Sequence, residues 1–168
     1  MKVFGNRNFL RSNSTAIYCA AILAALLSVM AFDATAQWIE KKGMSLSEAR
    51  KIAAAASAEA RKNSWNVVIA VVDDGGHLVY LERMDETQVG SINVAIEKAK
   101  TAINFKRPTK VFEEALTGGY TPLMSLQGAV LLDGGVPITL AGKVVGAVGV
   151  SGVTAAQDGQ IAKAGADA

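Results

Sequence analysis

The residues of this chain that could do chemistry gather in one short stretch, residues 73–85. It contains the only histidine of the protein, His77, directly after an Asp-Asp-Gly-Gly turn sequence. An imidazole can supply one axial bond to a haem iron, or it can act as a single acid or base near neutral pH. The alternatives for His77 are a solvated turn residue and a structural histidine whose hydrogen bonds are all satisfied.

Three further side chains with chemical capacity follow at the end of this stretch. Met84 could offer a thioether ligand, although an apolar strand position equally suits a side chain that fills the core. Arg83 and Asp85 could clamp a substrate or form an ion pair, and the alternative is that both are solvated charges. Alternation along an extended strand places His77 on the same face as Val79 and Arg83, with Met84 on the opposite face.

Several common kinds of site are excluded by residue type and spacing. One histidine cannot build a multi-histidine metal centre within one subunit. There is no Gly-x-Ser-x-Gly elbow and no Walker sequence, and the glycines of residues 146–152 do not have dinucleotide-fingerprint spacing. We interpret those glycines as strand positions that a helix or ligand must approach closely. The sequence therefore supports no standard hydrolase or dehydrogenase.

The N-terminus has the pattern of a secretory signal peptide. Three basic residues within the first eleven positions precede an apolar run over residues 16–32, and Ala-Thr-Ala follows at residues 34–36. A signal peptidase recognises such a small-x-small tripeptide, which predicts cleavage before Gln37. An uncleaved membrane anchor is the alternative, because the apolar run could just span a bilayer. We expect an exported protein, periplasmic or secreted, without a stable membrane anchor.

Removal of the first 36 of the 168 residues leaves 132, enough for one domain with a sizeable core, residues 37–168. Three of the 17 basic and one of the 15 acidic residues leave with the signal, so the mature chain has 14 of each. That balance, with no basic block interleaved with aromatics, predicts no nucleic-acid partner. The single cysteine, Cys19, is also removed, which excludes disulfides, thiolate metal sites and covalent haem attachment.

Capping signals and apolar periodicity predict the positions of the helices. Ser45 and Glu48 have capping-box spacing ahead of an apolar stripe, which predicts a helix over residues 46–62. Ser91 is the predicted N-cap of a second helix over residues 92–105.

Shorter elements are predicted in the second half of the chain. A short helix is expected over residues 109–116, and a loop over residues 117–127. Thr154 and Gln157 repeat the capping-box spacing and predict a C-terminal helix. Lys98 is interpreted as one of several cations that decorate the later turns of the second helix, where they suit the helix dipole.

Short apolar segments, separated by turn residues, predict five strands. Two of them flank an Asp-Gly turn signal and form a hairpin, because glycine supplies the positive φ that such a turn needs. The short connections favour antiparallel pairing. The fold class is therefore α+β, with helices packed on a five-stranded antiparallel sheet. The strands are predicted over residues 67–72, 77–84, 128–132, 136–140 and 144–150.

From about Ser45 to the C-terminus, the chain resembles the GlcG/HbpS family of haem-binding proteins, which is related to the C-terminal domain of PduO-type corrinoid adenosyltransferases. The resemblance is carried, in family order, by residues 73–85, 91–102, 134–138, 146–152 and 157–158.

The resemblance implies a profilin-like α/β fold with a five-stranded antiparallel sheet, assembled into homo-oligomers that are often octamers. It implies binding of haem b, in some members with haem degradation or iron release, and in secreted members a role in haem or redox sensing. By the same resemblance His77 is a candidate axial ligand of the haem iron. Arg83, Met84 and Asp85 match the motif that follows it and are expected beside the pocket or at a subunit contact.

Three functions remain open from the sequence. The leading hypothesis is an exported protein that binds haem reversibly. The second is a small-molecule lyase or isomerase, or an accessory protein of a catabolic pathway, that uses His77 with Asp85 or Arg83. The third is an oligomeric scaffold without haem, in which the motif residues serve assembly.

Overall fold

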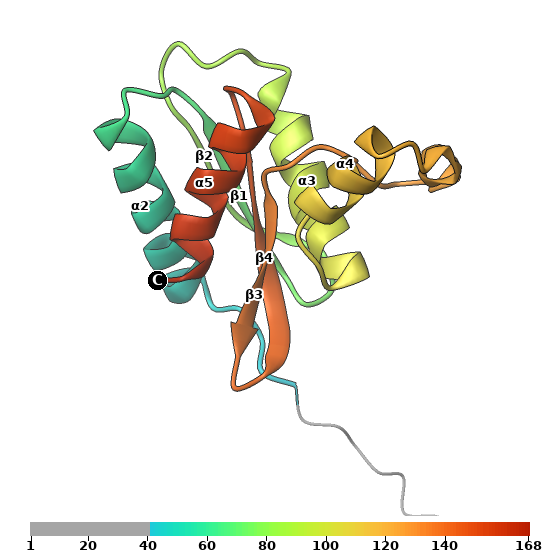
Figure 1. The fold of residues 1–168 in the computed structure, drawn as a ribbon. Coiled ribbons are helices and arrows are strands. Elements are labelled where there is room, and N and C mark those ends of the chain that lie inside the picture. The colour runs from blue at the N-terminus through green and yellow to red at the C-terminus, as the bar shows by residue number, and fades with distance from the viewer. Residues whose placement is uncertain (1–40) are drawn as a thin grey trace, which may run out of the picture. The chain divides into compact units, whose positions relative to one another are not determined.

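Three helices pack on the two faces of one antiparallel sheet, and a fourth, shorter helix lies farther from it, in the computed structural model, which describes residues 41–168 (Figure 1). The predicted signal peptide, residues 1–36, lies outside the described residues, and so do the first residues of the predicted domain. No helix within residues 41–168 has both the length and the hydropathy needed to cross a membrane. The α+β class and the antiparallel arrangement are confirmed, and the profilin-like description stays a prediction.

Helix α2, Leu46–Lys62, has the predicted bounds, and its N-cap forms as expected. The Ser45 hydroxyl accepts a hydrogen bond from the Glu48 amide at 3.1 Å. The side chain of Glu48, however, forms an ion pair with Lys51 at 2.8 Å. Alanines of the buried face let α2 lie close to the sheet and to helix α5, Ala155–Ala166. Helix α5 has the complete capping box predicted from Thr154 and Gln157.

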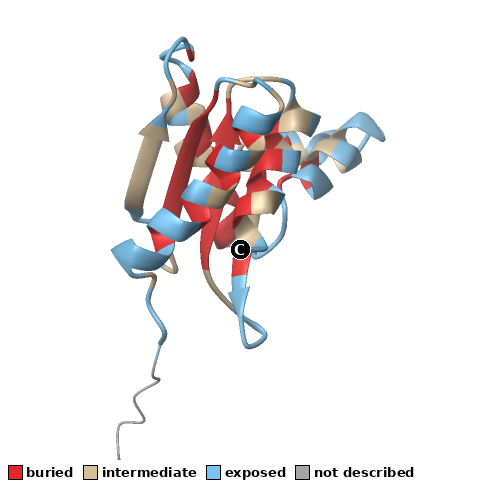
Figure 2. Ribbon diagram, turned by 90° about the vertical axis from the view of Figure 1, so that its left-hand side faces the viewer, coloured by how far each residue is buried: buried red, intermediate tan, exposed pale blue. Residues whose placement is uncertain are grey.

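The sheet has four strands in the order β2-β1-β4-β3, so β1 and β4 are central and β2 and β3 are edges. All neighbouring strands pair antiparallel. The bounds are Val68–Asp73 for β1, Leu78–Arg83 for β2, Gly135–Leu140 for β3 and Lys143–Ser151 for β4. Figure 2 shows the buried residues concentrated in the central strands and on the inward sides of the helices.

The prediction of a fifth strand over residues 128–132 is wrong. This segment follows helix α4, Lys110–Thr117, and the short 3-10 helix η1, Thr121–Ser125, and it pairs with no strand within residues 41–168. The Val130 amide instead donates a hydrogen bond at 2.9 Å to the Thr101 hydroxyl, on a helix. A backbone amide that is satisfied by a helix side chain does not need a strand partner, and this apolar segment forms the connection between η1 and β3.

Helix α3, Ser91–Phe105, covers the face of the sheet opposite to α2 and α5 (Figure 1). Its close approach depends on Gly149 of β4: a Cβ atom there would collide with the carbonyl oxygen of Ala95 and with the amide of Ala99. This agrees with the interpretation of the glycines as contact positions. The predicted N-cap, Ser91, is instead the first residue of α3, and its buried hydroxyl accepts a hydrogen bond from Ser151 at 3.3 Å.

A β-bulge in the first hairpin changes which side chains share a face. Val71 pairs with Tyr80, but Val72 pairs with Leu78, so Val79 is an extra residue in β2. As a result Val79 packs against the core beside α2, while Leu81 packs against the core beside α3. The prediction that simple alternation runs from His77 to Arg83 is therefore wrong, because the bulge interrupts the alternation.

Candidate functional site

The turn between β1 and β2 is built around the carboxylate of Asp73. Its Oδ1 atom accepts hydrogen bonds from the amides of Gly75, at 2.9 Å, and His77, at 2.8 Å. The Asp73 backbone makes two further hydrogen bonds in the turn. Its amide donates to the carbonyl of His77, and its carbonyl accepts from the amide of Gly76. Gly76 has φ +79°, a conformation that favours glycine. The Asp-Asp-Gly-Gly sequence thus forms a tightly bonded turn that ends at His77, one residue before β2.

The imidazole of His77 extends into solvent but keeps one specific contact. Its side chain is 81% exposed, and its Nδ1 atom lies 3.3 Å from Asp73 Oδ1. Histidines that bind metals commonly place one ring nitrogen against a carboxylate, which orients the ring and raises its basicity. The contact engages Nδ1 and leaves Nε2 as the ring nitrogen for an incoming ligand.

The same contacts act on Asp73. Partial burial by itself would raise the pKa of this carboxyl, but the amide hydrogen bonds from His77 and Gly75 and the neighbouring imidazole outweigh it and lower the pKa. The carboxylate therefore stays charged near neutral pH.

The structure does not bring Arg83, Met84 and Asp85 to His77. They follow at the far end of β2, and six residues of extended chain separate His77 from Arg83 by about 20 Å. Met84 is half-buried against the core beside α2, as the core-filling interpretation predicts. Arg83 and Asp85 are exposed, and neither forms an ion pair within residues 41–168. The buried Thr87 hydroxyl nearby has no hydrogen-bond partner in that part of the chain.

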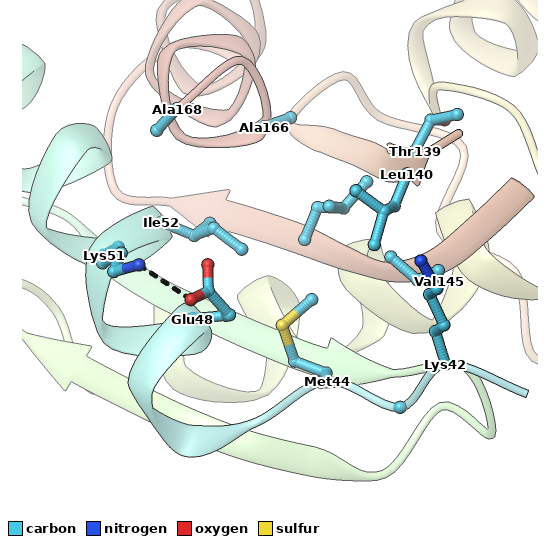
Figure 3. A pocket seen from close by; sticks show the side chains of 12 residues that line it. Lys42, Met44, Glu48, Lys51, Ile52, Thr139, Leu140, Val145, Ala166 and Ala168 are labelled. Atoms are coloured by element: carbon cyan, nitrogen blue, oxygen red, sulfur yellow. Dashed lines mark hydrogen bonds and ion pairs between the residues drawn. The ribbon is translucent and has the colours of Figure 1, made fainter. Parts of the chain in front are cut away.

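A cavity of about 160 Å³ opens at the end of the sheet where the His77 turn lies. At this end of the sheet Asp73 of β1 is the strand partner of Gly146 of β4. Lys41 forms an ion pair with Asp74 nearby, at 3.1 Å. The walls come from residues before and in α2, from the β3–β4 hairpin and from the end of α5 (Figure 3). The lining residues are Lys42, Gly43, Met44, Glu48, Lys51, Ile52, Ile138, Thr139, Leu140, Val145, Ala166 and Ala168.

Sequence reasoning missed this cavity. Its walls come from segments that are about 90 residues apart in the sequence, such as Met44 and Ile138, so no local motif signals it. The apolar stripe of α2 identified Ile52 as a core residue, which it is, but gave no indication that an open space lies beside it.

A second polar cluster is buried between α3, α5 and the start of β3. Lys98 Nζ lies 2.8 Å from Asp158 Oδ2, and the two side chains are only 2% and 3% exposed. Burial raises the pKa of Asp158, although the Lys98 ammonium acts in the opposite direction. Burial also raises the pKa of Asp133, whose carboxylate accepts a hydrogen bond from the Gly134 amide. The pair joins α3 to α5 across the end of the sheet.

The interpretation of Lys98 as a cation that decorates a later turn of the helix is wrong. Its side chain is almost completely buried because it lies on the packed face of α3, among Ala95, Ala99 and Ala102. Ala95, Lys98, Ala99 and Ala102 follow one another at i, i+3, i+4 and i+7, the spacing of one helix face, and this was the available signal. Within residues 41–168, no group of three or more histidine, cysteine, aspartate or glutamate side chains is arranged to hold a metal ion.

Comparison with known proteins identifies the family that this chain matches. A family described as "Haem degrading protein HbpS-like" matches residues 44–167. The protein GlcG of Escherichia coli strain K12 is 47% identical over 103 residues, which cover 61% of this chain and 77% of GlcG.

Solved structures give the same result. A double mutant of HbpS from Streptomyces reticuli superposes with a TM-score of 0.71 at 33% identity, covering 79% of this chain and 90% of HbpS. A PduOC:haem complex superposes with a TM-score of 0.67 at 28% identity, covering 74% of this chain and 93% of PduOC.

Proposed function

The chain belongs to the HbpS-like family, and from that membership we propose that it binds haem reversibly and without a covalent bond. The family description names haem, and a structural relative is a haem complex. A non-covalent b-type haem is the form we propose, because residues 41–168 contain no cysteine for covalent attachment.

The observation that carries the proposal is the exposed His77 imidazole held by Asp73. An axial ligand must reach the iron with an unengaged nitrogen and a fixed ring orientation. The 3.3 Å contact at Nδ1 supports the orientation, and the 81% exposure of the side chain leaves Nε2 accessible.

We propose that a second copy of the chain completes the haem site. Sites that enclose a ligand of drug size have volumes of roughly 300–1,000 Å³, and the cavity of about 160 Å³ is too small to enclose a haem. Haem bound at the exposed His77 therefore needs a further apolar surface to cover it. A homo-oligomer, with an octamer as the family-based expectation, would supply that surface.

Haemin titration followed by visible absorption tests the proposal, with wild-type protein and His77→Ala compared. A saturable Soret shift that is lost or moved in His77→Ala is the expected result. An unchanged shift in the variant would assign the iron to another residue. Absence of a saturable shift in both proteins would discard haem binding and favour the small-molecule hypothesis. The molecular mass of the native assembly, measured with and without haemin, tests whether a second copy of the chain takes part in haem binding.

We further propose that the protein acts outside the cytoplasm after removal of residues 1–36. The basic, apolar and small-x-small pattern of this segment supports the proposal. Mass spectrometry of the protein from the native host should find a mature N-terminus at Gln37. A chain that begins at Met1 in a membrane fraction would refute cleavage and favour the anchor.

A further inference from the structure

The turn that carries His77 lies against the C-terminal end of helix α3. A Cβ atom built on Gly76 would meet the side chains of Ile103, Asn104 and Lys100 at 3.7, 3.8 and 4.0 Å. Gly76 itself is buried, and the exposed His77 follows it directly. The helix ends two residues after Asn104 at its C-cap, Lys106. The end of α3 and its cap are therefore next to the His77 turn.

An exposed leucine stands beside His77 on the face of the sheet that α3 covers. Leu78 is 47% exposed, and its strand partner is Val72, which packs against α3. Directly paired residues of an antiparallel sheet have their side chains on the same face, so Leu78 faces the α3 side. Leu81 and Ile96 are partly buried on that side as well. A flat apolar molecule at His77 therefore has an apolar surface of the same chain next to it.

The acids of the β1–β2 hairpin and of α3 are all engaged with basic side chains. The four pairs are Asp73–His77, Asp74–Lys41, Glu82–Arg61 and Glu97–Lys100. No acid of these elements is left to neutralise a further cation at the end of α3. The one carboxylate whose partner can be uncharged is that of Asp73, which faces the imidazole.

Two cations at the end of α3, Lys106 and Arg107, have no acid partner within residues 41–168. Arg107 packs over the Phe112 ring, with 5.8 Å between its Cζ and the ring centroid. Lys106 is exposed and makes no such contact. The helix C-terminus carries about half a negative charge, and Asp73 adds one when the imidazole is neutral. The two cations exceed this sum, so the end of α3 has an excess of positive charge.

We propose that Lys106 binds a propionate carboxylate of the haem, while His77 meets the iron and Leu78 contacts the porphyrin ring. This role of Lys106 rests on the proposed haem binding and adds the residue that sets the orientation of the haem. A haem has a central iron, an apolar ring and two carboxylates on one edge. The His77 turn and the end of α3 present a complement to each of these three parts next to one another.

Titration of the full protein with haemin tests this role, with haemin dimethyl ester as a second probe whose propionates are esterified and uncharged. Lys106→Met should weaken haemin binding roughly two- to fivefold, as the loss of one solvent-exposed ionic contact. The difference from wild type should shrink with added salt, because salt screens exposed charges. Lys106→Glu should weaken binding further. Lys163→Met is the matched control, because Lys163 is an exposed lysine of α5 on the opposite face of the sheet, and should have no effect.

The ester separates the effect of charge from a change in the fold. It should bind wild type and Lys106→Met with equal affinity, and the Soret band with haemin should be the same in both proteins, because the iron ligand is unchanged. Equal haemin affinity of wild type and Lys106→Met, or an equal loss for haemin and its ester, would overturn the role of Lys106 while haem binding stands. Absence of a saturable Soret shift in wild type would instead refute haem binding, and the role of Lys106 with it.

Discussion

The Nδ1 atom of His77 lies 3.3 Å from Oδ1 of Asp73, four residues earlier, across the tip of the β1–β2 hairpin. The same Oδ1 atom accepts the amides of Gly75 and His77, so one carboxylate holds both the turn and the ring. If His77 binds haem iron, Asp73 is therefore the residue that positions it.

Asp73→Asn should weaken haem affinity about 10- to 100-fold, the usual effect of losing the outer partner of a metal-binding histidine. The asparagine oxygen can still accept the turn amides, so the fold should be preserved. Asp74→Asn is the matched control, because Asp74 pairs with Lys41 rather than with His77. Haemin titration of both variants measures the effect, and equal affinities would show that Asp73 does not position the ring.

Gly75→Ala should reorient the His77 imidazole with little loss of stability. A Cβ atom at Gly75 would lie 2.7 Å from His77 Nδ1, and the exposed ring can rotate away. Gly75 does not have positive φ, so alanine adds no backbone strain. We expect shifted His77 ring signals by NMR and a changed Soret band. Gly90→Ala, where the added atom meets open space, should leave both unchanged. Unperturbed ring signals in Gly75→Ala would contradict the geometry of the turn.

The Lys98–Asp158 pair should be strongly coupled. Removing one partner leaves a buried charge uncompensated, so Lys98→Met or Asp158→Asn should lower the free energy of unfolding by about 3–5 kcal/mol. The double variant should lose less than the sum of the two single variants, as measured by urea unfolding.

The exposed pair Lys163–Asp167, at 2.6 Å, provides the control for this cycle. Lys163→Met should change the free energy of unfolding by less than about 1 kcal/mol. Additive losses for Lys98 and Asp158 would mean that the two side chains do not interact as a buried ion pair.

Asp133→Asn should remove a pH-dependent loss of folding stability. Burial raises the pKa of Asp133 above its ordinary value of 3.8, so the folded state binds this proton more tightly than the unfolded state. The contribution of Asp133 to stability is then greatest below about pH 3.8 and is lost as the pH rises through the raised pKa. Asparagine keeps an acceptor for the Gly134 amide.

The stability difference between Asp133→Asn and wild type should therefore shift in favour of the variant as the pH rises from about 4 to about 7. Unfolding by urea at both pH values measures this difference. A difference that is constant, or that moves toward wild type as the pH rises, would contradict the inferred pKa direction.

Local features of the sequence predicted much of the fold. The bounds of α2 follow from the Ser45 cap and from apolar spacing, and the capping box at Thr154 places the start of α5. The first hairpin follows from its Asp-Gly turn. Each of these signals depends on hydrogen bonds and side-chain spacing within a few residues, and those interactions form wherever the segment lies in the molecule.

Family-level expectations were confirmed where they concerned membership and the α+β class, because the motifs span most of residues 41–168. The assignment of His77, Arg83, Met84 and Asp85 to a cofactor site stays a prediction. His77 is an exposed imidazole, and Arg83 lies about 20 Å from it along β2. Adjacency in a motif does not place side chains together when the motif runs along an extended strand.

By itself, the sequence determined the helices and the first hairpin. Only the tertiary structure decided the absence of a fifth strand, the bulge at Val79, the burial of Lys98 and the cavity beside α2. Val130 finds its partner 29 residues away on α3, and Lys98 finds Asp158 60 residues away. Strand pairing depends on which distant surfaces meet, and a pattern over a few residues does not show that. The spacing of Lys98 with its neighbouring alanines indicates a packed face of the helix, but it does not indicate Asp158 as the partner.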